Sequence, residues 1–453
     1  MKRRWPILFV FALWAALAAQ AQFTFSVNPG GATVTITGYT GPGGAAVIPA
    51  LTNGMQVTSL GGDAFLGCDD LTSITIPGSV ATIGVGAFNQ CAGLTNVTIA
   101  NGVASIGADA FACCGRLTSV AIPASVTNIG AEAFSSCSGL AAFTVDARNS
   151  FYAGAAGILF DKTLAALIAC PGGFRGSCAI PGSVNTIVNY AFEYCANLAG
   201  VTIPDSVTNL GAYAFQDCLS LTRVTIPARV TRIGPGAFMN CENLGSVAIL
   251  GPVTSFGQDA FYECRSLTNA TIASGVAAIG QGAFYQCANL AAVMIPASVT
   301  DIGDHAFSEC AGATNLTIAN GVSSIGQDAF SRCGRLTSVL IPSSVTRLGD
   351  RAFFECGGLT NVTIADGLAG IGRETFSQCA NLGSVTIPAS VASIGPSAFE
   401  GCVSLTKVYF KGNAPAVDSS VFLSDRSAAI YYLPGSIGWS SNFAKRPTII
   451  WKP

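Results

Sequence analysis

Cysteine offers the most chemistry in this chain, which has 17 cysteines and a single histidine among 453 residues. Fourteen of the cysteines follow one frame of 23 residues, and each stands three positions after a phenylalanine. They are Cys68, Cys91, Cys114 and Cys137, and then Cys195, Cys218, Cys241, Cys264, Cys287, Cys310, Cys333, Cys356, Cys379 and Cys402. Thiols in such an array could serve redox chemistry, bind metal or fill a core.

The regular step favours the core. Stacked coils place equivalent residues roughly 4.8 Å apart, which is near the disulfide range. Their Cβ atoms point in parallel, however, and this is the wrong geometry for a bridge. The chain has no C-x-x-C pair, and one histidine excludes a histidine-based metal site. We therefore predict structural thiols that behave as small hydrophobic side chains, with no metal and no cofactor.

Three cysteines lie outside the frame. Cys170 and Cys178 close a short loop that carries its own turn signal, Pro171-Gly172-Gly173. In an exported protein such a loop predicts a disulfide, and two unbridged thiols remain the open alternative. Cys113 has no evident partner in the sequence.

Catalytic side chains are scarce. His305 occupies a turn slot that holds Gly86, Asp109 or Glu132 in other coils. A Ser-His-Asp arrangement would require this histidine to be buried beside a nucleophile and an acid, and nothing in the pattern indicates that. The sequence predicts a protein that is not an enzyme.

The elements that position these residues are short coils, and residues 71–93 are a representative one. Leu71, Ile74 and Ile76 mark the buried face of a strand, and Pro77 ends it. Ala87, Phe88 and Cys91 then close the coil. A fixed period of this length is the signature of a solenoid, in which stacked coils bury a common core. We predict a β-rich repeat solenoid of about 16 coils.

The pattern L-x-x-V-T-I-P-x-S-V-x-x-I-G-x-x-A-F-x-x-C resembles the BspA-type (treponemal) leucine-rich repeats of secreted and surface proteins. The resemblance covers nearly all of the chain after residue 21. It implies a leucine-rich-repeat superhelix and a role in binding extracellular-matrix or host-cell proteins, and it adds that the cysteine slot holds a buried ladder residue.

The ends of the chain differ from the repeats. Residues 1–21 combine a basic start, a short apolar core and an A-x-A site, which predicts a signal peptide cleaved after Ala21. We expect an N-terminal β cap over 22–57, the repeat solenoid over 58–404 and a C-terminal capping segment over 405–453. The 58-residue gap between Cys137 and Cys195 predicts an irregular double coil with a hairpin at about 138–194.

Binding residues should stand where coils depart from the consensus. Candidate ligand contacts are Met239, Tyr262 and Tyr285 in the slot after the repeat phenylalanine, and Met294, Leu340 and Tyr409 on the outward strand face. Tyrosine and methionine are favoured in contact cores, so the first three are the main binding hypothesis. The alternative is that they only lie along the coil surface. Outward threonines such as Thr271 are first explained by the preference of threonine for a pleated surface, and a polar binding face is a compatible alternative.

Charged residues make up 10% of the chain and form no basic run, so nucleic-acid binding is not expected. No later stretch is long enough to span a membrane. We predict a secreted or cell-surface, adhesin-like protein that binds an extracellular protein or glycan. The alternatives are an extracellular spacer or self-assembling scaffold, so self-association remains open, and binding to an ice or crystal surface.

Overall fold

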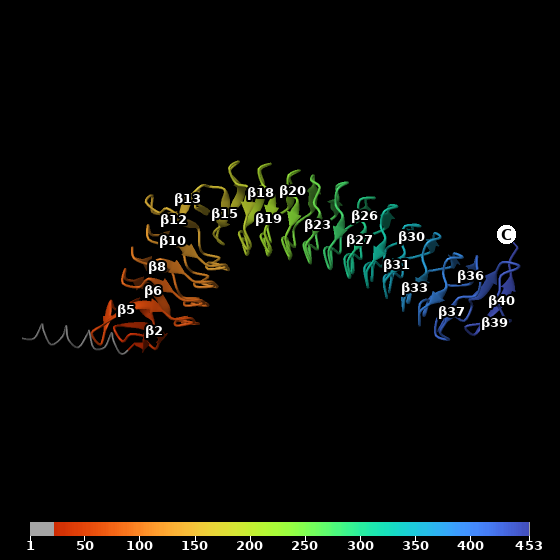
Figure 1. Cartoon of the computed structure of the whole chain (residues 1–453), viewed down its shortest axis with the longest axis horizontal. Coiled ribbons are helices and arrows are strands. Elements are labelled where there is room, and N and C mark those ends of the chain that lie inside the picture. The colour runs from red at the N-terminus through yellow and green to blue at the C-terminus, as the bar shows by residue number, and fades with distance from the viewer. Residues whose placement is uncertain (1–21, 453) are drawn as a thin grey trace, which may run out of the picture. The chain divides into compact units, whose positions relative to one another are not determined.

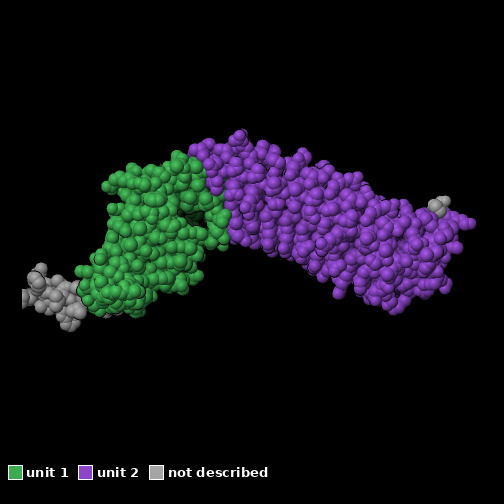
Figure 2. Space-filling model, viewed as in Figure 1, with its two compact units in different colours: residues 1–176, 187–197 green, residues 177–186, 198–453 purple. Residues whose placement is uncertain are grey.

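The computed structural model describes residues 22–452, which form β-strands joined by turns, with no helix among them. The chain winds into a β-solenoid of about 17 turns with a period of about 23 residues, which confirms the predicted fold (Figure 1). The described residues divide into two compact units (Figure 2). Unit 1 comprises the described residues up to Gly176 together with Ile187–Asn197. Unit 2 comprises Ser177–Thr186 together with the described residues from Leu198 onward. The expected signal peptide lies outside the described residues.

The strands of unit 1 are β1 (Phe23–Val27), β2 (Thr33–Tyr39), β3 (Gly44–Val47), β4 (Leu51–Thr52), β5 (Met55–Leu60), β6 (Leu71–Ile76), β7 (Thr82–Ile83), β8 (Asn96–Ile99), β9 (Ser105–Ile106), β10 (Ser119–Ile122), β11 (Asn128–Ile129), β12 (Ala142–Val145), β13 (Tyr152–Ala155), β14 (Ile158–Asp161) and β15 (Ala166–Ala169). Two further strands, β16 (Gly176–Ala179) and β17 (Thr186–Ile187), contain the boundaries between the units.

The longer strands of unit 2 are β18 (Leu198–Thr202), β20 (Arg223–Ile226), β22 (Ser246–Ile249), β24 (Asn269–Thr271), β26 (Ala292–Ile295), β28 (Asn315–Ile318), β30 (Ser338–Ile341), β32 (Asn361–Ile364), β34 (Ser384–Ile387), β36 (Lys407–Phe410), β38 (Ala429–Tyr432) and β40 (Arg446–Ile450). The short ones are β19 (Asn209–Leu210), β21 (Arg232–Ile233), β23 (Ser255–Phe256), β25 (Ala278–Ile279), β27 (Asp301–Ile302), β29 (Ser324–Ile325), β31 (Arg347–Leu348), β33 (Gly370–Ile371), β35 (Ser393–Ile394), β37 (Ala416–Val417) and β39 (Asn442–Phe443).

Each regular coil contributes one longer and one short strand, and both pair in parallel with the next coil. The register is one repeat, as in Thr75↔Thr98 between β6 and β8 and Ile83↔Ile106 between β7 and β9. Alternate residues of the longer strand face the core and solvent, so β8 reads exposed, buried, exposed, buried. The outward threonines therefore form a polar strand face, while the inward residues reach the core.

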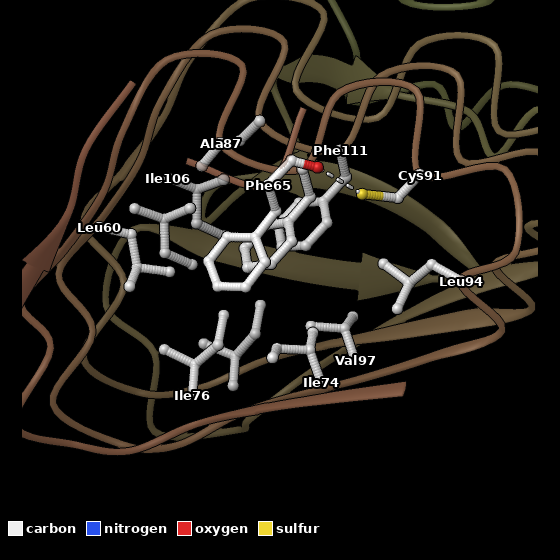
Figure 3. Close-up of a cluster of buried hydrophobic side chains, with 14 of the residues drawn as sticks. Leu60, Phe65, Ile74, Ile76, Ala87, Cys91, Leu94, Val97, Ile106 and Phe111 are labelled. Carbon is white, nitrogen blue, oxygen red and sulfur yellow. Dashed lines mark hydrogen bonds between the residues drawn. The ribbon is translucent and has the colours of Figure 1, made fainter. Parts of the chain in front are cut away.

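The core is a set of columns, one residue type per slot (Figure 3). In the coil that contains Cys91, Ile74, Ala87 and Phe88 are all essentially inaccessible to solvent. The phenylalanine rings stack from coil to coil, with centroids 4.6–5.5 Å apart from Phe65 to Phe134 in unit 1. In unit 2 the spacing is 5.0–5.7 Å from Phe215 to Phe422. Repeated burial of one large side chain per coil supplies much of the hydrophobic stabilisation.

The fourteen in-frame cysteines form what we call the thiol column. Eleven of them donate a hydrogen bond from Sγ to the carbonyl oxygen of the phenylalanine 26 residues earlier, at 3.0–3.4 Å. Figure 3 shows the bond from Cys91 to Phe65. Burial raises the pKa of Cys137 and Cys379 to about 12, so these thiols stay protonated. The thiol links each coil to the one before it.

Glycine follows the short strand because consecutive coils approach closely there. A Cβ on Gly84 would lie 2.6 Å from the carbonyl carbon of Gly61, and one on Gly303 would lie 2.6 Å from the amide nitrogen of Gln281. Real Cβ atoms do not tolerate such contacts with backbone. Close approach of the coils, as well as a bend, therefore requires glycine in this slot.

The irregular segment and the ends add antiparallel pairs to the solenoid. β13 pairs antiparallel with β14, and β14 with β15, within the segment where we expected a hairpin. At the start of the chain β1 pairs antiparallel with β2, which pairs in parallel with β5. At the other end β39 and β40 form an antiparallel hairpin, and Trp439 packs against Phe410, Tyr432 and Phe443. Within residues 22–452 there is no helix that could cross a membrane.

Candidate interaction surface

Each regular coil turns at two residues with left-handed backbone conformation. One stands two positions before the repeat phenylalanine and the other directly before the repeat cysteine, such as Asp259 (φ 55°) and Glu263 (φ 56°). His305 (φ 57°) occupies the first of these slots, and its ring lies at the edge of Tyr285 with centroids 6.5 Å apart. The phenylalanine between the two turns and the alanine before it are buried, whereas the residue after the phenylalanine is half-buried in the coils of Met239, Tyr262 and Tyr285.

Three of the predicted contact residues occupy the slot after the phenylalanine on consecutive coils. We call Met239, Tyr262 and Tyr285 the turn ridge. Backbone hydrogen bonds fix its register, because the Asn240 N–H donates to the Tyr262 carbonyl and the Glu263 N–H to the Tyr285 carbonyl, each at 2.8 Å. The tyrosine rings stack with centroids 5.0 Å apart and planes 10° apart. All three side chains are half-buried.

A line of alternating charge continues the turn ridge. The Tyr285 hydroxyl donates to Glu309 Oε1 at 3.2 Å, and Gln286 Nε2 donates to Glu309 Oε2 at 2.9 Å. Arg332 then contacts Glu309 through Nη1 at 2.9 Å and Glu355 through Nε at 3.0 Å. We call Glu309, Arg332 and Glu355 the charge ladder. It joins three consecutive coils at the left-handed residue before the cysteine.

Two members of the ladder, Glu309 and Arg332, are held in their ionised states. Partial burial alone would raise the pKa of Glu309, but hydrogen bonds from Gln286, Arg332 and Tyr285 outweigh it and hold that pKa below its ordinary value. Hydrogen bonds to Glu309 and Glu355 raise the pKa of Arg332. Desolvation and then Glu309 raise the pKa of Tyr285, so its hydroxyl stays protonated as a donor. The arrangement presents fixed charges beside two aromatic rings.

A surface depression of about 540 Å³ lies beside the charge ladder. It is lined by Arg265, Gln286, Ala288, Glu309, Ala311 and Arg332. The small Ala288 and Ala311 leave room where Arg265 stands one coil earlier. Polar donors and acceptors thus border a shallow hollow close to the half-buried tyrosines, a combination suited to contact with another molecule. The described residues contain no cluster of histidine, cysteine, aspartate or glutamate that could hold a metal ion.

The other three predicted contacts lie on longer strands rather than in turns. Met294 in β26 and Leu340 in β30 are 69% and 54% exposed on the strand face, with Met294 paired to Thr317 of β28. Tyr409 in β36 is half-buried because it packs against Tyr431 and Trp451, with ring centroids 5.1 and 4.8 Å apart. The six candidates therefore divide between the turn ridge and the strand face.

The two predicted disulfide partners are both buried. Cys170 follows β15 in unit 1, whereas Cys178 lies in β16 in unit 2. Their bridge stays a prediction. Cys113, by contrast, is the exposed cysteine among the described residues, at the left-handed position before Cys114.

The sequence hypothesis missed the charge ladder. Its signal is present in the repeat frame, since Glu309, Arg332 and Glu355 stand 23 residues apart in one slot and alternate in charge. Because the charge alternates from coil to coil in this slot, Arg332 lies between two carboxylates, those of Glu309 and Glu355. A slot-by-slot reading of charge, as well as of hydrophobicity, would have found it.

Comparisons with known proteins agree with this architecture. The model of the BspA-type leucine-rich repeat region matches residues 53–154, 176–291 and 300–429. A leucine-rich repeat protein from Bacteroides ovatus has 23% identity and a TM-score of 0.56, over 95% of this chain and 98% of its own. One from Eubacterium ventriosum has 23% identity and a TM-score of 0.52, over 74% and 92%. A leucine-rich cell surface protein from Faecalibacterium prausnitzii has 28% identity and a TM-score of 0.47, over 86% and 94%.

No curated protein matches the chain significantly. The two leucine-rich repeat proteins with the higher TM-scores share the fold, and the family model covers most of the residues between 53 and 429. Together with the 23-residue coils, the phenylalanine stack and the thiol column, this match shows that the chain belongs to the BspA-type leucine-rich repeat family.

Proposed function

We propose that this chain is a non-enzymatic interaction protein, secreted or displayed at the cell surface, that binds an extracellular protein or glycan in the manner of an adhesin. The turn ridge is its first contact surface. The observation that carries the proposal is the stacked pair Tyr262 and Tyr285, which departs from the small and polar residues in most equivalent slots.

Several properties of the ridge support binding. Aromatic side chains with polar tips and nearby arginines are enriched where protein contacts are strongest. Glu309 of the charge ladder holds the Tyr285 hydroxyl, and Tyr262 stacks on the Tyr285 ring, so these two tyrosines have less conformational entropy to lose on binding. The side chains carry no part of the core, which is filled by the columns beneath them.

The test is to replace Met239, Tyr262 and Tyr285 together with serine and to measure binding to an array of purified extracellular-matrix proteins and glycans. We expect at least a tenfold loss of affinity for any ligand of the unaltered protein, with an unchanged circular dichroism spectrum. The matched control replaces Met294 and Leu340 with serine on the strand face. Unchanged binding by the ridge variant together with loss in the control would move the contact to the strand face.

A scaffold without a foreign ligand gives a different result. The unaltered protein would then bind nothing on the array and would sediment as oligomers whose size grows with concentration. A monomer with a saturable ligand supports the proposal, and concentration-dependent oligomers without a ligand contradict it.

A further inference from the structure

Exposed aliphatic side chains gather on the last loop and strand of unit 2. Ile437, in the loop after β38, is 70% exposed, and Ile449 and Ile450 in β40 are 43% and 57% exposed. By the strand register, Ile449 occupies the outward slot that holds Thr363 in β32 and Thr386 in β34. Aliphatic residues that lie together in water mark a contact surface.

The strand register brings the residues that follow three longer strands to one corner of the fold. Phe410 of β36 pairs with Tyr432 of β38, which pairs with Ile450 of β40. Figure 1 shows β36 and β40 together at the blue end of the chain. Lys411 and Trp451, which directly follow β36 and β40, therefore lie at the same corner.

The loop of Ile437 is tied to this corner by its backbone. The Ile437 N–H donates to Asn413 Oδ1, and the Ala414 N–H donates to the Ile437 carbonyl, each at 3.0 Å. Both partners follow Lys411 closely in the chain, so the exposed Ile437 side chain stands near this lysine. We name the surface formed by the corner and the adjoining strand the terminal patch, which consists of Lys411, Ile437, Ile449, Ile450, Trp451 and Lys452.

The patch holds Trp451 at the surface. Its ring is half-buried and packs against the outward Tyr409, with centroids 4.8 Å apart. Other rings fill the core at this end of unit 2, where Phe410 packs against Trp439 and Phe443. The indole of Trp451 is therefore fixed beside the core and still meets solvent.

The patch is positively charged. Lys411 and Lys452 are exposed, and neither side chain has an ion pair or a hydrogen bond among the described residues. Residues 403–452 contain six basic and two acidic residues, although acids outnumber bases in the whole chain. Of the two acids, Asp425 is buried, and Asp418 follows the short strand β37 rather than a longer strand. No carboxylate of this segment therefore neutralises the two lysines.

Aliphatic, aromatic and basic residues in this combination match an anionic lipid surface. Aliphatic side chains enter the boundary between headgroups and acyl chains, tryptophan prefers that boundary, and lysines attract anionic headgroups. A protein partner fits less well, because lysine is depleted in protein contact cores. A polysaccharide fits less well too, since it would leave the isoleucines without an apolar partner.

We propose that the terminal patch docks unit 2 on the surface of an anionic lipid bilayer. The contact is peripheral, with the three isoleucines at the boundary of the acyl chains and the two lysines among the headgroups. The patch shares no residue with the turn ridge, so lipid docking and ligand binding by the ridge can each fail without the other.

Co-sedimentation with lipid vesicles tests the proposal. Vesicles of phosphatidylcholine with about 30% phosphatidylglycerol should bind the protein, whereas vesicles of phosphatidylcholine alone should bind it far more weakly. Binding should weaken as the salt concentration rises from about 0.05 M to about 0.5 M, because salt screens the attraction of the lysines. All variants carry the same residues 1–21, so differences between them report the patch.

Two variants separate the apolar and the charged contributions. Ile437→Ser should lower the affinity for the anionic vesicles by roughly tenfold or more, because one aliphatic side chain no longer leaves water. Lys411→Gln combined with Lys452→Gln should lower it by roughly 25-fold and remove most of the salt dependence. The altered side chains are exposed, so the circular dichroism spectrum should not change.

Matched controls remove the same kinds of side chain elsewhere in unit 2. Met294→Ser removes an apolar side chain that is 69% exposed, and Arg223→Gln with Arg232→Gln removes two exposed positive charges. Both controls should bind the vesicles as the unaltered protein does. Absence of binding by the unaltered protein overturns the proposal, as does an equal affinity for neutral and anionic vesicles. Losses in the controls as large as those in the patch variants also overturn it.

Discussion

Replacing Cys287 with alanine tests whether the thiol column stabilises unit 2. Cys287 is 0% exposed, and its Sγ donates to the Phe261 carbonyl at 3.2 Å. The substitution removes a buried group about the size of a methylene, which costs roughly 1 kcal/mol of transfer free energy. Loss of the hydrogen bond from a weak donor adds about 0.5 kcal/mol, and the cavity left behind adds a further contribution. We expect the free energy of unfolding to fall by about 1.5–2.5 kcal/mol.

The matched control is Cys113→Ala, which removes an exposed thiol and should change stability by less than about 0.5 kcal/mol. Because repeat coils are stabilised mainly by their neighbours, hydrogen exchange resolved to single coils is the best assay. Protection should fall most in the coils on either side of Cys287 and remain unchanged in unit 1. Equal losses in the two variants, or a uniform loss in both units, would refute the reasoning that the column links adjacent coils.

Three further outcomes follow from the same contacts. Gly303→Ala should destabilise the protein by about 1–3 kcal/mol in chemical denaturation because its Cβ would clash with the preceding coil, whereas Gly334→Ala, with nothing within 4 Å, should be nearly neutral. A thiol reagent should modify Cys113 rapidly in the native protein; in denaturant without reductant it should modify 17 thiols, or 15 if Cys170 and Cys178 are bridged. Stability should fall above about pH 9, since the column thiols ionise near 9 when unfolded but near pH 12 when buried, as for Cys379; a flat profile from pH 8 to 11 would contradict this.

The repeat frame was sufficient to predict the core. Phe88 and Cys91 recur at fixed positions, and a side chain that recurs every coil in a stack must lie on its neighbours' equivalents. The predicted columns are confirmed by their burial. The direction of the Cys91 thiol was not predictable, because the bond to the Phe65 carbonyl depends on how far one coil is offset from the next. The offset is a property of the stack and is absent from any single coil.

The candidate surface was predictable only in part, for a related reason. Tyr262 and Tyr285 stood out because they differ in type from other residues in their slot. The contact of Tyr285 with Glu309, and of Glu309 with Arg332, could not be predicted without knowing that the slot before the cysteine turns left-handed and lies beside the slot after the phenylalanine. Such neighbours are set by turn geometry, which hydrophobic periodicity does not encode.

In a regular repeat, a residue that departs from the consensus is more informative where its slot normally requires one kind of side chain. The slot after the phenylalanine accommodates many residue types, so a tyrosine there costs little stability and is available for binding. The thiol slot is buried, so burial raises the pKa of the aspartate that occupies it, Asp425, to about 7. Asp425 therefore differs from the tyrosines of the turn ridge, because the buried slot that the preceding thiols define changes the ionisation of the side chain itself.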